Sequence, residues 1–520
     1  MCATSVTLPR NFANSRQCIA ELRDKAEQFK HTGYIRVLDS ELTVVKSDRA
    51  ISKELQDELR AGVKALEDVP DHEKDWHPYQ EDKVLDLVHP SLFPVVWGLT
   101  RVLEEGTVPL DSCVAYTGKG VVVPSYTPQP SAWEPQPPTL WGSFQWLPAQ
   151  VELAVDGRAK ITSYINNLHP VEHKALYSAL ERIVSATVPL WDDTLSGFVD
   201  GLRFDLSYTG SEDYTFHPGL KYHIPGRQGP KSVWDPIKEA YDDVDGDDDD
   251  SDDDDDWRWE QDFDDWQRDN RILVHREPRE YIPQTELLAR RKSTISLRDN
   301  FPDGLQVIFK LANIHLTPET PTYRGGSWHV EGTLNEMICA SAIYYYDQEN
   351  ITNSHLAFRQ ALDAGEIGMI HEQGEYDSLE KFLGVELDGS AVQDLGRVLT
   401  REGRLLVFPN CLQHRVEPFE LRDKTRAGHC KILAMFLVNP HRPILSSAHV
   451  PPQRRDWWAD EVRRGGALSV LPSEILDMTV SMVDDFPISW DQAVEIRERL
   501  MGERGRFTNE LTDYFESVSG

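Results

Sequence analysis

GGSWHVEG (residues 325–332) is the stretch of this 520-residue chain that decides its fold and its chemistry. Its His329 and Glu331 are two residues apart, so on an extended strand both side chains point to the same face. A second histidine, His414, follows a short apolar strand that ends at Pro409. Two histidines and one carboxylate are the ligand set of a non-haem Fe(II) site, which leaves metal positions open for other ligands. The sequence therefore predicts a catalytic metal centre made by His329, Glu331 and His414.

Apolar runs of strand length surround these three residues. They are residues 305–316 (LQVIFKLANIHL), 337–346 (MICASAIYYY) and 431–438 (KILAMFLV). The order of strand, ligand pair, long connection, strand, ligand and strand is typical of a double-stranded β-helix, or jelly-roll, barrel. We therefore expect an α+β protein with a jelly-roll barrel core, helical N- and C-terminal additions, and the ligands inside the mouth of the barrel.

Two alternatives to an oxygenase stay open. The same donor set suits zinc, so the chain could be a metal-dependent hydrolase or isomerase on a cupin-like barrel, although the helical His-Glu-x-x-His motif is absent. A short His-x-Glu motif also matches by chance, which leaves a non-catalytic binding protein as the other alternative. The retained carboxylate Glu331 favours hydroxylation, desaturation or ring closure over halogenation.

Longer motifs resemble a fungal family, the domain-of-unknown-function family 4246. The resemblance covers most of the chain and rests on DLVHPSLFPVVWGLTRVL (86–103), SYINNLHP (163–170), GGSWHVEGTLNEMICASAIYYYDQENIT (325–352) and GHCKILAMFLVNPHR (428–442). This family is similar to Fe(II)/2-oxoglutarate-dependent dioxygenases, so the resemblance implies Fe(II) and 2-oxoglutarate as cofactors, with O2 and a small molecule as substrates. The resemblance of this chain also extends to a fungal oxygenase of secondary metabolism, which closes an aziridine ring on L-valine on the route to 2-aminoisobutyrate. A small aliphatic amino acid is the substrate that it implies.

The resemblance also implies a cation for the distal carboxylate of 2-oxoglutarate, on the strand after the second histidine. An arginine or a lysine fits that carboxylate best. The expected position is Cys430, which cannot supply a charge. Lys431 is the first candidate in its place, and Arg426, 12 residues after His414, is the second. The alternative for each is an ordinary solvated cation.

The substrate-facing residues are predicted from strand alternation. In residues 337–346 the odd-numbered side chains share one face, which is the face of Glu331 if no bulge intervenes. Ile343 and Tyr345 are therefore candidates to shape the substrate pocket. Their alternative role is to fill the core of the barrel.

Composition limits the possible partners. The formal charge is −33, and residues 242–256 alone hold 12 aspartates. A run of like charges with little to bury is typical of a disordered loop. No basic face is present for nucleic acid or for an anionic membrane.

The chain also lacks a signal-peptide core, an apolar run of the roughly 20 residues that span a bilayer, and any Cys-x-x-Cys pair. We expect a cytoplasmic protein, and no pattern indicates its oligomeric state.

Three regions follow from these patterns. Residues 1–140 are predicted to be mainly helical. Residues 141–450 are predicted to form the jelly-roll oxygenase core, with an acidic disordered insertion at about 226–300. Residues 451–520 are predicted to be helical, because Ser489 and Gln492 have capping-box spacing before an apolar periodic run.

Overall fold

The computed structural model describes residues 15–38, 43–125, 142–196, 221–223, 272–274, 283, 294–361, 380, 384, 389–390, 392–465, 471–484 and 486–517. The aspartate run at 242–256 and most of the predicted insertion at 226–300 lie outside the described residues. Among the helices of the described part, none is both long and apolar enough to cross a membrane.

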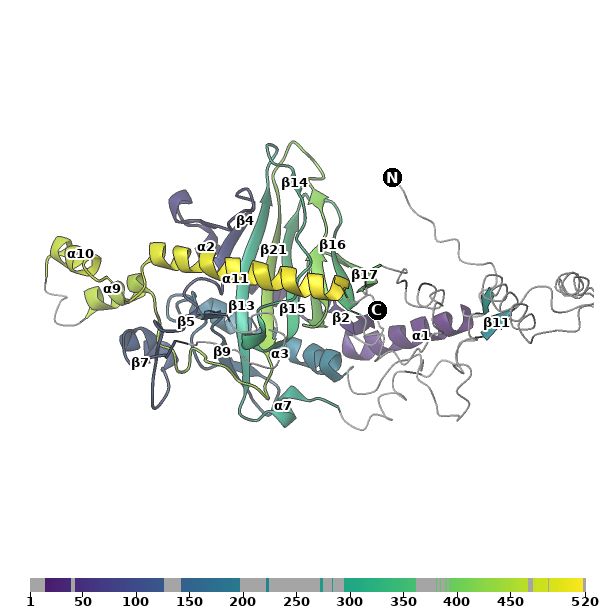
Figure 1. Cartoon of the computed structure of the whole chain (residues 1–520), viewed down its shortest axis with the longest axis horizontal. Helices are drawn as coiled ribbons and strands as arrows, with labels where there is room; N and C mark the ends of the chain where they lie inside the picture. The colour runs from purple at the N-terminus through teal and green to yellow at the C-terminus, as the bar shows by residue number, and fades with distance from the viewer. Residues whose placement is uncertain are drawn as a thin grey trace, which may run out of the picture.

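A large antiparallel sheet forms the centre of the described structure (Figure 1). Its strands pair in the order β1-β2-β18-β15-β21-β13-β4-β3, and β9 joins it through β13 and carries β10. The bounds are β1 Tyr34–Val37, β2 Val44–Ser47, β3 Asp75–Trp76, β4 Val84–Val88, β9 Ala149–Leu153, β10 Ala159–Ile161, β13 Leu305–Leu316, β15 Ile338–Glu349, β18 Arg404–Pro409 and β21 Gly428–Val438.

A smaller sheet, β17-β16-β19, faces the large one. Phe358 on β16 and Phe408 on β18 meet edge to face with ring centroids 5.0 Å apart. The strands of this sheet are β16 Ser354–Ala361, β17 Val392–Thr400 and β19 Gln413–Val416. Two-stranded pairs complete the β structure: β5 Val95–Val96 with β8 Phe144–Gln145, β6 Arg101–Val102 with β7 Val121–Val122, β11 Lys221–His223 with β12 Ile272–Val274, and β14 Thr322–Tyr323 with β20 Phe419–Glu420.

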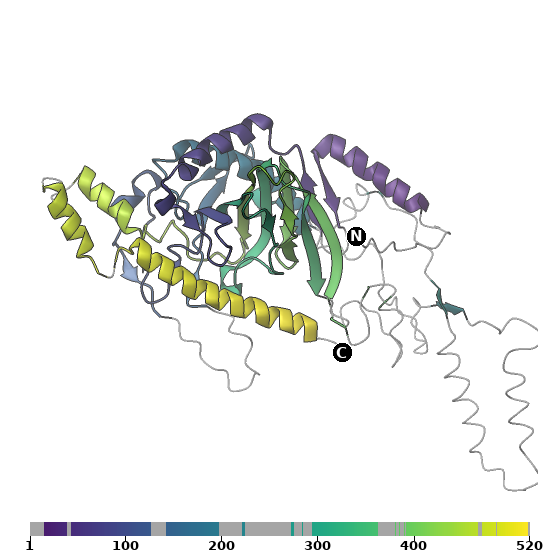
Figure 2. The same cartoon turned by 90° about the horizontal axis from the view of Figure 1, so that it is seen from above.

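The two faces of the large sheet are covered differently. Odd-numbered residues of β13, such as Val307, pack in one apolar cluster with helices α2 (Lys53–Glu67) and α3 (Lys174–Ser196). Even-numbered residues, such as Ile308, pack in a second cluster with the small sheet and with α11 (Trp490–Ser517). We call this second side the inner face. Figure 2 shows the sheets lying between α11 on one side and α2 with α3 on the other.

The remaining helices lie at the periphery. They are α1 Ser15–Thr32, α7 Leu297–Asn300, α9 Arg455–Arg464 and α10 Ser473–Ser481, with 3-10 turns at Asp71–Glu73, Leu110–Tyr116 and Leu334–Glu336. The predicted capping box before α11 is confirmed, because Ser489 Oγ accepts from Gln492 N at 3.3 Å and Gln492 Oε1 accepts from Ser489 N at 2.9 Å.

The predicted mixture of helices and antiparallel sheets is confirmed. The expectation that residues 1–140 are mainly helical stays a prediction, and the described part of this region holds the short strands β1 to β7 as well as α1 and α2. These strands are two to five residues long, too short for a clear alternating pattern. Residues 451–520 contain α9, α10 and α11.

Candidate metal centre

His329, Glu331 and His414 come together beside the inner face. The Nε2 atom of His414 lies 3.3 Å from Oε1 of Glu331, and Nε2 of His329 lies 3.8 Å from the same oxygen. The three donor atoms all lie within 4.8 Å of one another. The side chain of His414 is 3% exposed, whereas that of His329 is 36% exposed, so the centre is closed on one side and open on the other.

A backbone bridge aligns the two histidines. The amide of His329 donates to the carbonyl of His414 at 3.2 Å, and the amide of His414 donates back at 2.9 Å. This antiparallel bridge places the first motif next to β19 and brings the two ring centroids to 4.4 Å. The triad is therefore assembled by β pairing between segments that are far apart in the sequence.

Glycine is required at both ends of the first motif. Gly325 has φ +88°, and a Cβ there would lie 2.7 Å from the carbonyl oxygen of Val416. Gly332 has φ +72°, and a Cβ there would lie 2.5 Å from Oε2 of Glu336. Because only glycine adopts such positive φ values without strain, these two positions let residues 325–332 pack closely against β19 and against Glu336.

Trp328 holds the same segment from the outside. Two guanidinium groups lie over its ring, that of Arg359 at 4.8 Å and that of Arg415 at 4.4 Å from the ring centroid. Such cation–π contacts contribute roughly 0.5–2 kcal/mol each, according to how far they are shielded from water. They fix the residue next to His329 against β16 and β19.

The hydrogen bonds of His329 leave the correct nitrogen free for a metal. Nδ1 of His329 lies 2.9 Å from the carbonyl oxygen of Ser327. Because a carbonyl oxygen only accepts, Nδ1 carries the proton and Nε2 presents its lone pair toward Glu331. A carbonyl partner on the second ring nitrogen is the usual arrangement for a histidine that binds metal. The donor set and this tautomer together fit a divalent ion.

The protonation states also suit metal binding. Burial opposes ionisation of Glu331, but its hydrogen bond with His414 and the positive charges around it, including Lys310, lower its pKa to about 2. Burial, with the charges of His414 and Lys310, lowers the pKa of His329 to about 4. At neutral pH Glu331 is ionised and His329 is neutral, the states in which each binds a metal ion.

Asn410 positions Glu331, a role that the sequence does not reveal. Its Oδ1 accepts from the amide of Glu331 at 2.8 Å, and its Nδ2 donates to the carbonyl of Glu331 at 2.8 Å. An asparagine after Pro409 is an ordinary turn signal, so nothing in the pattern distinguishes it.

The structure does not bring either predicted cation to the triad. Lys431 lies on the face of β21 opposite to Cys430, and its Nζ is 2.9 Å from Glu67 on α2. Arg426 is exposed and pairs with Glu349 at 3.0 Å. Strand alternation accounts for the first placement, because consecutive residues of a strand face opposite sides.

Ile343 and Tyr345 do face the side of the triad. Both are buried in the inner cluster together with Phe358 and Phe408. The rings of those two phenylalanines lie 6.4 Å and 4.8 Å from the ring of His414. Contact of Ile343 or Tyr345 with a substrate stays a prediction.

Residues 13–461 match a family described as a protein of unknown function, DUF4246. This chain belongs to that family. The match confirms the family that the sequence motifs predict, and its description assigns no activity. No curated protein matches the chain.

Solved structures resemble this DUF4246 protein only in part. IDO from Bacillus thuringiensis is 12% identical with a TM-score of 0.16, over 26% of this chain and 46% of that one. The Fe(II)/α-ketoglutarate-dependent dioxygenase TqaL is 14% identical with a TM-score of 0.17, over 28% and 50%. A prolyl-4-hydroxylase from Pseudomonas putida is 14% identical with a TM-score of 0.15, over 27% and 59%. The matches cover less than two thirds of each of those chains, and TM-scores this low carry no argument.

The described part of this DUF4246 protein holds a second group of possible ligands, His77, Asp86 and His89. Nδ1 of His77 lies 2.7 Å from Oδ2 of Asp86, and Nε2 of His89 lies 3.9 Å from the same oxygen. The amide of Ser91 donates to Nδ1 of His89 at 3.1 Å, so the proton of a neutral His89 is on Nε2, facing Asp86. To bind metal through Nε2, His89 would have to carry its proton on Nδ1, where the amide of Ser91 already donates. We therefore assign no metal to this group, in which His77 hydrogen-bonds the buried carboxylate of Asp86 and His89 lies beside them.

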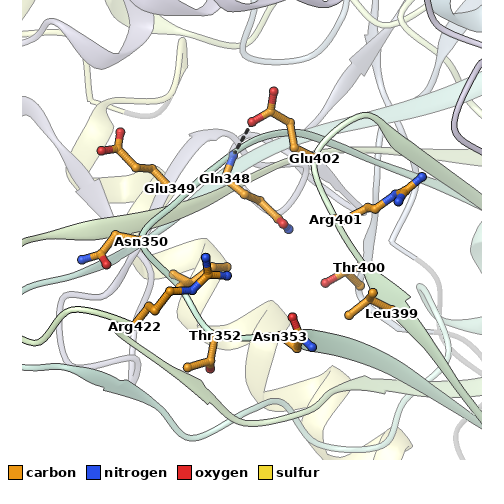
Figure 3. Close-up of a pocket in the computed structure, with 11 residues that line it drawn as sticks. Gln348, Glu349, Asn350, Thr352, Asn353, Leu399, Thr400, Arg401, Glu402 and Arg422 are labelled. Carbon is orange, nitrogen blue, oxygen red and sulfur yellow. Dashed lines mark hydrogen bonds between the residues drawn. The ribbon is translucent and has the colours of Figure 1, made fainter.

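A surface pocket lies at the other end of the β core. It has a cavity of about 210 Å³ and is lined by residues 348–353, residues 399–402 and Arg422. Its side chains are mainly polar (Figure 3). Gln348 in its wall is nine residues along β15 from Cys339, whose carbonyl accepts from Asn410 beside the triad. Nine strand residues span roughly 30 Å, so this pocket is separate from the metal centre.

Proposed function

We propose that this protein is a non-haem Fe(II)/2-oxoglutarate-dependent dioxygenase that oxidises a C–H bond of a small aliphatic amino acid. The observation that carries the proposal is the triad, in which two imidazoles and one carboxylate converge within 4.8 Å on a centre that is open on one side. Such a facial set of ligands is characteristic of non-haem Fe(II) oxygenases.

The arrangement of strands supports a jelly-roll core, which we propose as part of the same assignment. Along the chain, β15 lies in the large sheet, β16 and β17 in the small sheet, β18 in the large, β19 in the small and β21 in the large. This exchange of consecutive strands between two facing antiparallel sheets is the pattern of a jelly roll. It places His414 on the small sheet, beside the apolar inner face.

In this proposal, some residues would bind the iron and others would hold those ligands in position. His329, Glu331 and His414 hold the iron, Ser327 fixes the tautomer of His329, and Asn410 fixes the backbone of Glu331. Bound iron and 2-oxoglutarate supply the activation of O2, with succinate and CO2 as the products of the cosubstrate. The apolar inner cluster keeps bulk water from the closed side of the centre.

The substrate assignment rests on the family resemblance and on two side chains. Ile343 and Tyr345 present an aliphatic and an aromatic surface on the inner face, which suits a small aliphatic side chain such as that of L-valine. The reaction is oxidative aziridine ring closure or hydroxylation. Which of the two occurs depends on where the substrate radical lies relative to its own amine.

The test is release of succinate by protein reconstituted with Fe(II) and supplied with 2-oxoglutarate and O2, with and without a panel of small amino acids. We expect one aliphatic amino acid to stimulate turnover. His414→Ala should abolish turnover, because a two-ligand site holds iron poorly. His449→Ala is the matched control, because His449 is an exposed histidine away from the triad.

Two results would change this assignment. Metal-dependent release of succinate that no amino acid stimulates would support the assignment as an oxygenase and contradict the assignment of the substrate. Protein that holds iron and releases no succinate would contradict the oxygenase, and would favour a hydrolase or a binding protein.

A further inference from the structure

The surface pocket at the far end of β15 contains an arginine without a counter-ion. Arg422 lies in the wall of this pocket, and its side chain has no ion-pair or hydrogen-bond partner in the part of the chain that the structure describes. Figure 3 shows this side chain extending into the pocket. A guanidinium group is a planar set of donors that matches the two oxygens of a carboxylate.

The other charged side chains of the pocket wall already have partners. The ion pairs are those of Arg401 with Asp48, Glu402 with Arg60 and Glu349 with Arg426. The charge of Arg422 is therefore the unmatched charge of the wall, and it suits a ligand with one negative charge. A second negative charge on the ligand would be repelled by the carboxylates of Glu349 and Glu402.

A buried hydroxyl group faces the same pocket. Thr400, the last residue of β17, lies in the wall and is 3% exposed. Its Oγ1 has no hydrogen-bond partner among the described residues. Figure 3 shows Thr400 across the pocket from Arg422. A buried hydroxyl without a partner is uncommon in a folded protein, and a ligand that accepts its hydrogen bond would explain it.

The backbone around Arg422 is held in place by β15. Leu421 forms an antiparallel bridge with Ile351, and the amide of Arg422 donates to the carbonyl of Asn350 at 3.1 Å. The side chain of Asn350 accepts from the amide of Asp423 at 2.9 Å and donates to the carbonyl of that residue at 2.9 Å. Because the chain is fixed on both sides of Arg422, binding of a ligand requires little further ordering of the backbone.

We propose that this pocket binds a small monocarboxylate, which pairs with Arg422 and accepts a hydrogen bond from Oγ1 of Thr400. The cavity of about 210 Å³ limits the size of the ligand, since a water molecule occupies roughly 30 Å³ of liquid. The amides of Gln348 and Asn353 line the same space and suit a ligand that also carries a hydroxyl group. This inference does not rest on the proposed function, because the pocket is separate from the metal centre.

The test compares three acids with their amides, on the full chain after removal of metal with a chelating resin. Acetate, glycolate and L-lactate each carry one negative charge, whereas acetamide, glycolamide and L-lactamide are uncharged and have nearly the same shape. Ligand-detected NMR titrations at low ionic strength give the dissociation constants. We expect at least one acid to bind about 10-fold more tightly than its amide, the lower end of the effect of a charged hydrogen bond, because Arg422 is exposed.

The variants assign that preference for the acid. Arg422→Gln should remove it. Thr400→Val should weaken binding of the acid several-fold without lowering the midpoint of thermal unfolding, because a hydroxyl without a partner contributes no hydrogen bond to the fold. Lys424→Gln is the matched control, since it removes a positive charge from the same loop outside the pocket, and it should keep the preference. His414→Ala should also keep it.

Each of the other outcomes contradicts a stated part of the proposal. A wild type that binds no acid more tightly than its amide overturns the site, and so does a preference that survives in Arg422→Gln. A preference lost in His414→Ala would place the acid at the triad and also overturns the site. Tighter binding of inorganic phosphate than of any acid overturns the assignment to a monocarboxylate, and unchanged binding in Thr400→Val overturns the role of the hydroxyl. None of these measurements depends on release of succinate, so this site and the proposed function are tested separately.

Discussion

At the scale of single residues, the geometry of the proposed metal site depends on side chains outside the set of three ligands. Asn410 is bonded to both the amide and the carbonyl of Glu331. We expect Asn410→Ala to weaken binding of Fe(II) or Co(II) by about 10- to 100-fold, the usual effect of losing a residue that orients a ligand. Metal titration of the purified protein measures this. Asn353→Ala, at an exposed position in the remote pocket, is the control, and equal affinities in the two variants would contradict the role of Asn410.

The residue scale also shows which parts of the site a sequence can reveal. That the three triad residues lie together could be predicted, because each stands beside an apolar strand and the strand period puts His329 and Glu331 on one face. The role of Asn410 could not be predicted in this way, because it exists only once β15, β18 and the first motif are packed together.

At the scale of elements, one carboxyl joins α3 to α7 and gives stability a pH dependence. Oδ1 of Asp192 accepts from the amide of Leu297 at 2.7 Å, and burial raises the pKa of Asp192 from 3.8 to about 6. An acid with a raised folded-state pKa holds its proton more tightly when folded, so stability falls as pH rises through this range. Asp192→Asn keeps the acceptor and removes the charge. We expect it to raise the free energy of unfolding by about 1–3 kcal/mol at pH 8, with no gain below about pH 4.

Unfolding of both proteins at pH 8 and at pH 4 measures this difference. Asp111→Asn is the control, because Asp111 is exposed. A gain of the same size at both pH values would show that charge on Asp192 is not its cause.

The elements that could be predicted are those whose pattern is local and long. The runs that predicted strands at 305–316, 337–346 and 431–438 correspond to β13, β15 and β21, and the Ser489 capping signal marks the start of α11. The short strands β3, β5 and β6 have two residues each. Such strands are defined by their partners in the sheet, so their own sequence carries almost no signal.

At the scale of the whole molecule, a buried ion pair connects the C-terminal helix to the segment that follows the candidate metal centre. Arg504 on α11 pairs with Glu336, which is 168 residues away in the sequence and is 0% exposed. The guanidinium group also lies 3.7 Å from the ring of Trp146. Glu336 accepts from the amides of Trp146 and Thr333, so three distant segments meet at one carboxylate just after Glu331. No local sequence pattern predicts these contacts, because Arg504, Glu336 and Trp146 are each an ordinary charged or aromatic residue in their own segments.

Removal of Arg504 should therefore affect both stability and metal binding. Arg504→Met leaves a buried carboxylate without its cation, which typically costs about 3–5 kcal/mol. We expect a lower midpoint of thermal unfolding and a lower Fe(II) affinity, since Glu336 also packs against Gly332 next to Glu331. Arg506→Met, two residues along α11 at an exposed position, should change neither. The double variant Glu336→Gln/Arg504→Met removes the unpaired charge and should recover part of the lost stability. A double variant no more stable than Arg504→Met alone would mean that packing of the arginine on Trp146, and not the ion pair, holds α11 in place.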